Sequence, residues 1–104
     1  MKTYNKLVRD KIPDIIKADG GKCKFHIANK KEEFSNMLNS KLFEEVEEFI
    51  ENPCAEKIAD ILEVIEFIGG MHSISLDEIK EVKKKKREER GSFKLKIVLD
   101  NVTH

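Results

Sequence analysis

Two stretches of helical periodicity, joined by a short Pro-containing link, constrain the fold more than any other feature of this sequence. In the first stretch, apolar residues recur every three or four positions: Phe34, Met37, Leu38, Leu42, Val46, Phe49 and Ile50. The second has the same spacing: Ile58, Ile61, Leu62, Ile65 and Ile68. Such spacing places apolar side chains on one face of an α-helix. Because Asn52-Pro53 leaves little chain between them, the two helices are predicted to be antiparallel.

Caps and breakers set the expected ends of these and two further helices. The first long helix is expected to begin at an Asn29 cap, and the second to end at Gly69-Gly70. A short helix with Asp10 as a plausible cap should precede them and end at Gly20-Gly21. SLDE at 75–78 is a capping-box pattern that opens another helix, which should end at Gly91.

Two segments alternate between apolar and polar residues, as strands with one buried face do. They are residues 22–28, with Cys23, Phe25 and Ile27 on one side, and residues 93–99, FKLKIVL. We therefore expect an all-α domain with a minor two-stranded β element from these segments. At 104 residues, the chain should form a single domain, 1–104.

Composition narrows the classes of partner. Twenty Lys and Arg balance twenty Asp and Glu, so no net field favours nucleic acid or a membrane, and neither is expected as a partner. The apolar runs are too short for a signal peptide, and Cys23 and Cys54 lack the spacing of a zinc or redox motif. A cytoplasmic protein is expected. The three histidines are scattered, so a histidine-ligated metal is not expected.

The glutamates of the first long helix divide into two sets on a helical projection of about 100° per residue. Glu44, Glu47 and Glu51 fall opposite the apolar stripe and read as a solvated face. Glu45 and Glu48 point toward the core side, where an unpaired carboxylate is costly. Some positive group is therefore expected beside Glu45 and Glu48.

Asp60 lies at the margin of the second apolar stripe, and packing of the two helices should bring it to Glu45 and Glu48. Clustered carboxylates repel unless a cation neutralises them, and oxygen ligands suit Mg²⁺ or Mn²⁺. The alternative is that these acids pair with lysines such as Lys41 and Lys57, which also lie toward the apolar side. Spacing leaves both possibilities open.

Four blocks of sequence resemble the small single-domain members of the MazG-like and phosphoribosyl-ATP pyrophosphohydrolase superfamily. They are YNKLVRDKIPDII, KLFEEVEEF, ADILEVIE and EVKKKKREERGSFKLKIVL. The resemblance implies a MazG-like helical bundle and a Mg²⁺-dependent enzyme. Its substrate would be a nucleoside triphosphate, ordinary or damaged, hydrolysed between the α- and β-phosphates to a monophosphate and pyrophosphate. Phosphoribosyl-ATP is an alternative substrate.

The metal signature of this superfamily is Glu-Glu-x-x-Glu on one helix and Glu-x-x-Asp on the next. Glu44, Glu45 and Glu48 match its first half, and Asp60 matches the end of the second. These four are the catalytic residues that the resemblance implies. Metal ligands would be Glu45, Glu48 and Asp60.

The sequence departs from the signature at one position. Lys57 stands where the glutamate before Asp60 would be, and the nearest acid, Glu56, is the candidate replacement ligand. Lys57 could instead pair with Asp60 or contact a substrate phosphate. It also favours an alternative function, a catalytically weak nucleotide-binding or regulatory protein on the same fold.

Several cations could contact phosphates. Lys83, Lys86 and Arg90 share a helical face with Ile79. Further candidates are Lys6, Arg9 and Lys11. A solvated basic helix is the alternative for the first set. A nucleic-acid binder using the Lys83 helix is disfavoured by the zero net charge and the lack of Trp.

A homo-oligomer, dimer or larger, is expected as well. Two amphipathic helices and a short one cannot cover the apolar residues Phe49, Ile50, Val64, Phe67 and Ile68.

Overall fold

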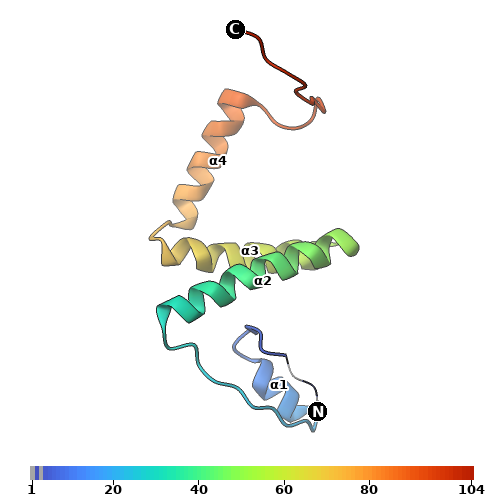
Figure 1. Cartoon of the computed structure of the whole chain (residues 1–104), viewed down its shortest axis with the longest axis vertical. Coiled ribbons are helices and arrows are strands. Elements are labelled where there is room, and N and C mark those ends of the chain that lie inside the picture. The colour runs from blue at the N-terminus through green and yellow to red at the C-terminus, as the bar shows by residue number, and fades with distance from the viewer. Residues whose placement is uncertain (1, 3) are drawn as a thin grey trace. The chain divides into compact units, whose positions relative to one another are not determined.

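The computed structural model describes residue 2 and residues 4–104, and its regular secondary structure there is entirely helical (Figure 1). The helices are α1 (Ile12–Ala18), α2 (Lys31–Glu51), α3 (Ala55–Met71) and α4 (Leu76–Arg90). This confirms the predicted all-α class. The chain divides into two compact units, Met1–Ser73 and Ile74–His104, which are described separately.

The predicted two-stranded β element is wrong, since the described residues include no strand at 22–28 or 93–99. Alternation specifies a strand only where one face is buried, and here Phe25, Ile27 and Phe93 are all exposed. Residues 93–99 also contain a turn, because the Lys96 N–H donates to the Phe93 carbonyl at 3.1 Å and Lys96 has φ 58°.

The short helix α1 begins one residue later than a cap at Asp10 would require. Its N-cap is Lys11, which makes no capping side-chain bond, and Pro13 lies in the first turn, where its missing N–H is harmless. Gly20, at φ 88°, ends the helix by donating its N–H to the Lys17 carbonyl. A positive φ of this kind is easily adopted only by glycine.

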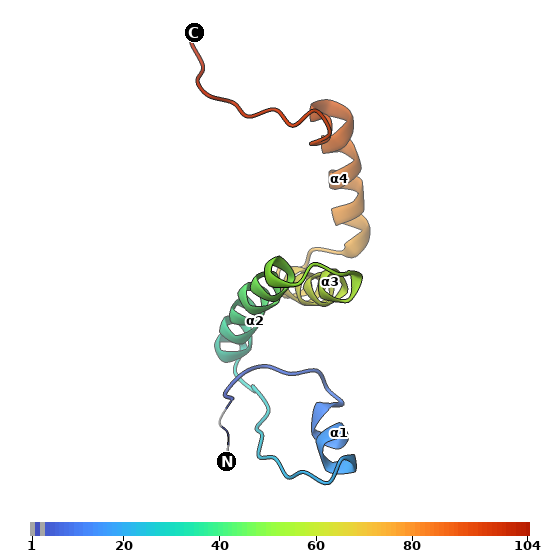
Figure 2. The same ribbon diagram turned by 90° about the vertical axis from the view of Figure 1, so that its right-hand side faces the viewer.

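Helices α2 and α3 form an antiparallel hairpin, as predicted, and Figures 1 and 2 show them side by side. The cap of α2 is Lys30 rather than Asn29, and α3 continues through Gly69-Gly70 to Met71. Glycine weakens a helix by about 1 kcal/mol but keeps its backbone donor, so it need not end one. Pro53 instead determines where the turn between α2 and α3 lies, and Cys54 after it is extended before α3 begins.

The core of the hairpin is small. Leu38 from α2 and Val64 from α3 are its buried apolar side chains among the described residues, and Glu45 is buried with them. Several large apolar side chains of the two helices stay exposed: Phe43, Ile50, Ile58, Leu62, Ile65 and Phe67. Of the stripe expected to be uncovered, Ile50 and Phe67 are exposed, whereas Val64 is buried.

Helix α4, in the second unit, has the ends that its sequence predicts. The Ser75 hydroxyl accepts from the Glu78 N–H at 3.1 Å, and Gly91 follows the last turn at φ 83°. Its residues are half-buried or exposed. In the part of the chain described, no helix has both the length and the apolar character to cross a membrane.

Candidate functional site

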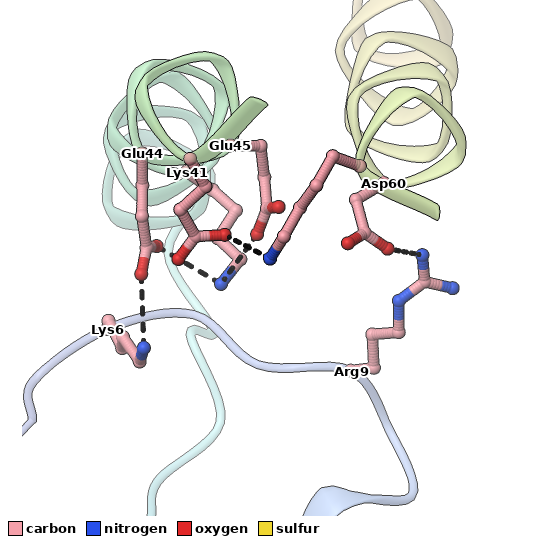
Figure 3. Close-up of polar contacts among 8 residues, drawn as sticks. Lys6, Arg9, Lys41, Glu44, Glu45 and Asp60 are labelled. Atoms are coloured by element: carbon pink, nitrogen blue, oxygen red, sulfur yellow. Dashed lines mark hydrogen bonds and ion pairs between the residues drawn. The ribbon is translucent and has the colours of Figure 1, made fainter. Parts of the chain in front are cut away.

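Three of the four acids predicted from the sequence, Glu44, Glu45 and Asp60, lie on the side of the α2–α3 hairpin that faces the N-terminal segment, residues 4–11 (Figure 3). Glu44, Glu45 and Glu48 come from α2 and Asp60 from α3. Each carboxylate pairs with a cation, and these cations are Lys6, Arg9, Lys41 and Lys57. We call these eight residues the charged cluster.

Glu45 is the innermost member of the charged cluster. It is 6% exposed, and its Oε1 lies 3.3 Å from the Lys41 ammonium, one helical turn earlier. Its Oε2 is buried and accepts no hydrogen bond from any described residue. Burial raises the pKa of Glu45, the charges of Glu48 and Asp60 raise it further, and Lys41 opposes both effects. The prediction that Glu45 points inward is confirmed.

Glu44 is half-buried, so its assignment to a solvated face is wrong. Its two oxygens accept from Lys6 at 3.0 Å and from Lys41 at 3.1 Å. Burial acts to raise the pKa of Glu44, but the hydrogen bonds from Lys6 and Lys41 outweigh it and lower the pKa. Lys41 therefore bridges Glu44 and Glu45. Glu47, by contrast, is exposed as predicted.

Glu48 pairs with Lys57, whose ammonium donates to Oε2 at 2.9 Å. This hydrogen bond lowers the pKa of Glu48 and raises that of Lys57. The partner of Lys57 is thus Glu48, rather than the Asp60 suggested by helical spacing. Lys57 lies within the acidic group, at the place where the resemblance implies a ligand.

Asp60 receives a hydrogen bond from the guanidinium of Arg9 at 2.9 Å, across 51 positions of sequence. Lys6 likewise reaches Glu44 across 38 positions. The sequence presents Lys6 and Arg9 only as candidate phosphate contacts, and no local spacing predicts their pairing with these acids. The only feature of the sequence that could have suggested a common role is that Lys6 and Arg9 stand three residues apart in a segment without a regular helix.

The donor chemistry of the charged cluster fits a hard cation. All four acidic side chains offer oxygen, and the buried Oε2 of Glu45 lacks a donor among the described residues. Within the described part of the chain, however, no three Asp, Glu, His or Cys side chains gather closely enough to hold an ion. Lysine ammoniums lie among the carboxylates instead (Figure 3). A metal bound to Glu45, Glu48 and Asp60 would therefore have to displace their cationic partners, which are Lys41, Lys57 and Arg9.

Glu56, the candidate replacement ligand, is exposed and takes part in none of the ion pairs found among the described residues. A hollow of about 240 Å³ adjoins the charged cluster, between α2 and the N-terminal segment. Asn5, Lys6, Lys41 and Glu44 contribute polar groups to its wall. The hollow is thus small, and its wall carries charged groups.

The cations predicted on α4 belong to the second unit. Lys83 and Lys86 line a shallow surface with Ile79 and Val82, which confirms the face they were predicted to share with Ile79. Arg90 is exposed in the last turn. Contact of these three residues with phosphates stays a prediction.

Comparison with known proteins found no matching family model, no similar curated protein and no similar solved structure.

Proposed function

We propose that this chain is a Mg²⁺-dependent nucleotide pyrophosphohydrolase. It would hydrolyse a nucleoside triphosphate between the α- and β-phosphates and release pyrophosphate. The observation that carries the proposal is the buried Glu45, whose Oε2 meets no donor among the described residues and which lies in one cluster with Glu44, Glu48 and Asp60. A buried carboxylate without full compensation is costly and is commonly kept for function.

The roles follow from burial and position. Glu45, Glu48 and Asp60 would hold Mg²⁺, or Mn²⁺, which neutralises and positions the phosphates when bound. Glu44 is then the remaining carboxylate of the charged cluster, and its side chain, 29% exposed, would orient the attacking water. Lys57, displaced from Glu48, could contact a phosphate as a point charge. Ordinary or damaged nucleoside triphosphates are the proposed substrates, with phosphoribosyl-ATP as an alternative.

Pyrophosphate release from a panel of nucleotides tests this proposal. We expect release with Mg²⁺, none in chelator, and a loss of at least about a hundredfold in Glu45→Gln and Glu48→Gln, since each removes a negative charge facing the metal. Glu47→Gln is the matched control, because Glu47 lies on the same helix and is exposed. Activity that persists in chelator, or in both variants while circular dichroism shows them folded, contradicts the proposal.

A second candidate is a catalytically weak nucleotide-binding or regulatory protein. The ion pair of Lys57 with Glu48, at 2.9 Å, favours this function, because an ammonium at a ligand position competes with a metal. Substituting Lys57 separates the two functions, as described in the Discussion.

We also propose a homo-oligomer acting in the cytoplasm. The exposed apolar residues of α2 and α3, such as Phe43, Ile50 and Leu62, offer a surface that self-association would bury. Cys23 and Cys54 are free and exposed thiols, which suit a reducing compartment.

A further inference from the structure

The N-terminal segment passes along the open side of the charged cluster and places two cations on it (Figure 3). Lys6 binds Glu44 of α2 and Arg9 binds Asp60 of α3, at 3.0 and 2.9 Å. One short segment therefore contacts the acids of both helices. No other described segment outside α2 and α3 forms an ion pair with these acids.

The four cations of the cluster differ in their access to solvent. The side chains of Lys6 and Arg9 are 40% and 59% exposed, against 17% for Lys41 and 28% for Lys57. Exposed ion pairs contribute little to stability. Lys6 and Arg9 can therefore leave their carboxylates at small cost, whereas the side chains of Lys41 and Lys57 are less exposed to solvent.

The charge balance of the cluster indicates which kind of ligand would displace Lys6 and Arg9 from their carboxylates. The cluster contains four acidic and four basic side chains and is neutral as it stands. A divalent cation bound to the carboxylates would add positive charge and leave the ammonium and guanidinium groups without partners. Phosphate oxygens are suitable new partners, since Lys binds them as a point charge and Arg as a bidentate fork.

We infer that the segment around Lys6 and Arg9 is a polyphosphate-binding element whose cations neutralise Glu44 and Asp60 in the free protein and transfer to the ligand's phosphates when it binds. The hollow of about 240 Å³ beside Lys6 is smaller than the roughly 300–1,000 Å³ of most small-molecule pockets, so it suits phosphates rather than a whole nucleotide. This inference rests on the proposed function in taking a polyphosphate, together with a divalent cation, as the ligand.

Tyr4 provides a direct readout of this element. It is the only tyrosine of the chain, which has no tryptophan, and the Lys6 ammonium lies 5.5 Å from its ring centroid. If Lys6 moves to a phosphate, the environment of this ring changes. Titration of the wild type with inorganic tripolyphosphate and Mg²⁺ should therefore change tyrosine fluorescence.

Calorimetry with the same probe gives the affinities of the variants. Because a charge-assisted hydrogen bond is lost in each, Lys6→Gln and Arg9→Gln should bind tripolyphosphate roughly tenfold more weakly than the wild type. Lys6→Arg keeps the charge and should retain most of the affinity. Lys24→Gln is the matched control, an exposed lysine of the same unit outside the cluster, and should change affinity by less than about twofold.

Three results would overturn the inference: wild-type affinity in both Lys6→Gln and Arg9→Gln, an equal loss in Lys24→Gln, or tyrosine fluorescence that tripolyphosphate leaves unchanged. The failure of the proposed function can be distinguished from the failure of this inference. Binding that depends on Lys6 and Arg9, without pyrophosphate release from any nucleotide, sustains the inference and removes the hydrolase. Hydrolysis that is normal in both variants, with unchanged tripolyphosphate affinity, sustains the hydrolase and removes the inference.

Discussion

Replacing Glu45 by methionine should stabilise the protein at neutral pH. Methionine has nearly the length of glutamate, favours helices and is apolar, so it fits a position that is 6% exposed. The change removes the buried Oε2, which has no donor within the described residues. Lys41 is not left alone by the substitution, because it keeps its hydrogen bond to Glu44 at 3.1 Å.

The magnitude follows from two opposing contributions. Removing an unsatisfied buried polar group is worth about 1–3 kcal/mol. Losing the ion pair of Glu45 with Lys41, one turn apart in α2, costs about 0.5 kcal/mol. The net gain should be about 0.5–2.5 kcal/mol, and each kcal/mol raises Tm by roughly 4–8 °C in a domain of this size.

The gain should also depend on pH, with a defined sign. Burial raises the folded-state pKa of Glu45 above its usual value. Below its unfolded pKa the carboxyl is neutral in both states and carries no charge penalty, whereas above the folded pKa the buried charge destabilises the wild type. The charge-dependent part of the advantage of Glu45→Met should therefore grow as the pH rises through the folded-state pKa of Glu45, and it should be absent at and below about pH 4, near the unfolded pKa.

Thermal unfolding of both proteins at several pH values, followed by circular dichroism, measures this difference. Glu47→Met makes the same chemical change at an exposed position of the same helix and should shift Tm little. The reasoning is refuted if Glu45→Met is less stable than the wild type at pH 7, or if its advantage is equally large near pH 4. Pyrophosphate release should be lost in the same variant, so stability and activity would change in opposite directions.

Two further measurements address the metal site and the assembly. Lys57→Glu removes the counterion of Glu48 and adds a carboxylate, so calorimetry should show tighter Mg²⁺ binding, and unchanged binding would place Lys57 outside the site. In that variant, faster pyrophosphate release would indicate that the wild type is mainly a nucleotide binder, and slower release that Lys57 contacts a phosphate. Sedimentation at micromolar concentration should show a dimer or larger species, since Phe43, Ile50 and Leu62 are exposed, and a 12.1 kDa monomer would contradict this.

Helical periodicity predicted most of the fold because the hairpin depends on local pattern. The spacing of apolar residues gave the extents of α2 and α3 to within a few positions, and the capping box at Ser75 gave the start of α4. The errors arose where tertiary context decides. Alternation at 93–99 found no partner strand among the described residues, and α3 passes through Gly69-Gly70.

The candidate site was also predicted only in part from the sequence. The inward direction of Glu45 follows from about 100° of rotation per residue, and so does the exposure of Glu47. The partial burial of Glu44 does not, because Lys6 reaches it from 38 positions away. Spacing also left open whether a metal or lysines neutralise the acids. The structure shows ion pairs with lysine and arginine, which depend on how α2, α3 and the N-terminal segment pack.

The neutrality of the charged cluster bears on how fast a ligand can bind. Opposite charges held about 3 Å apart cancel each other's field within a short distance, and the chain as a whole has no net charge. An approaching polyphosphate is therefore not drawn in by long-range attraction, and its encounter rate should vary little with ionic strength. Rearrangement of Lys6 and Arg9 after contact, rather than diffusion, would then limit the association rate.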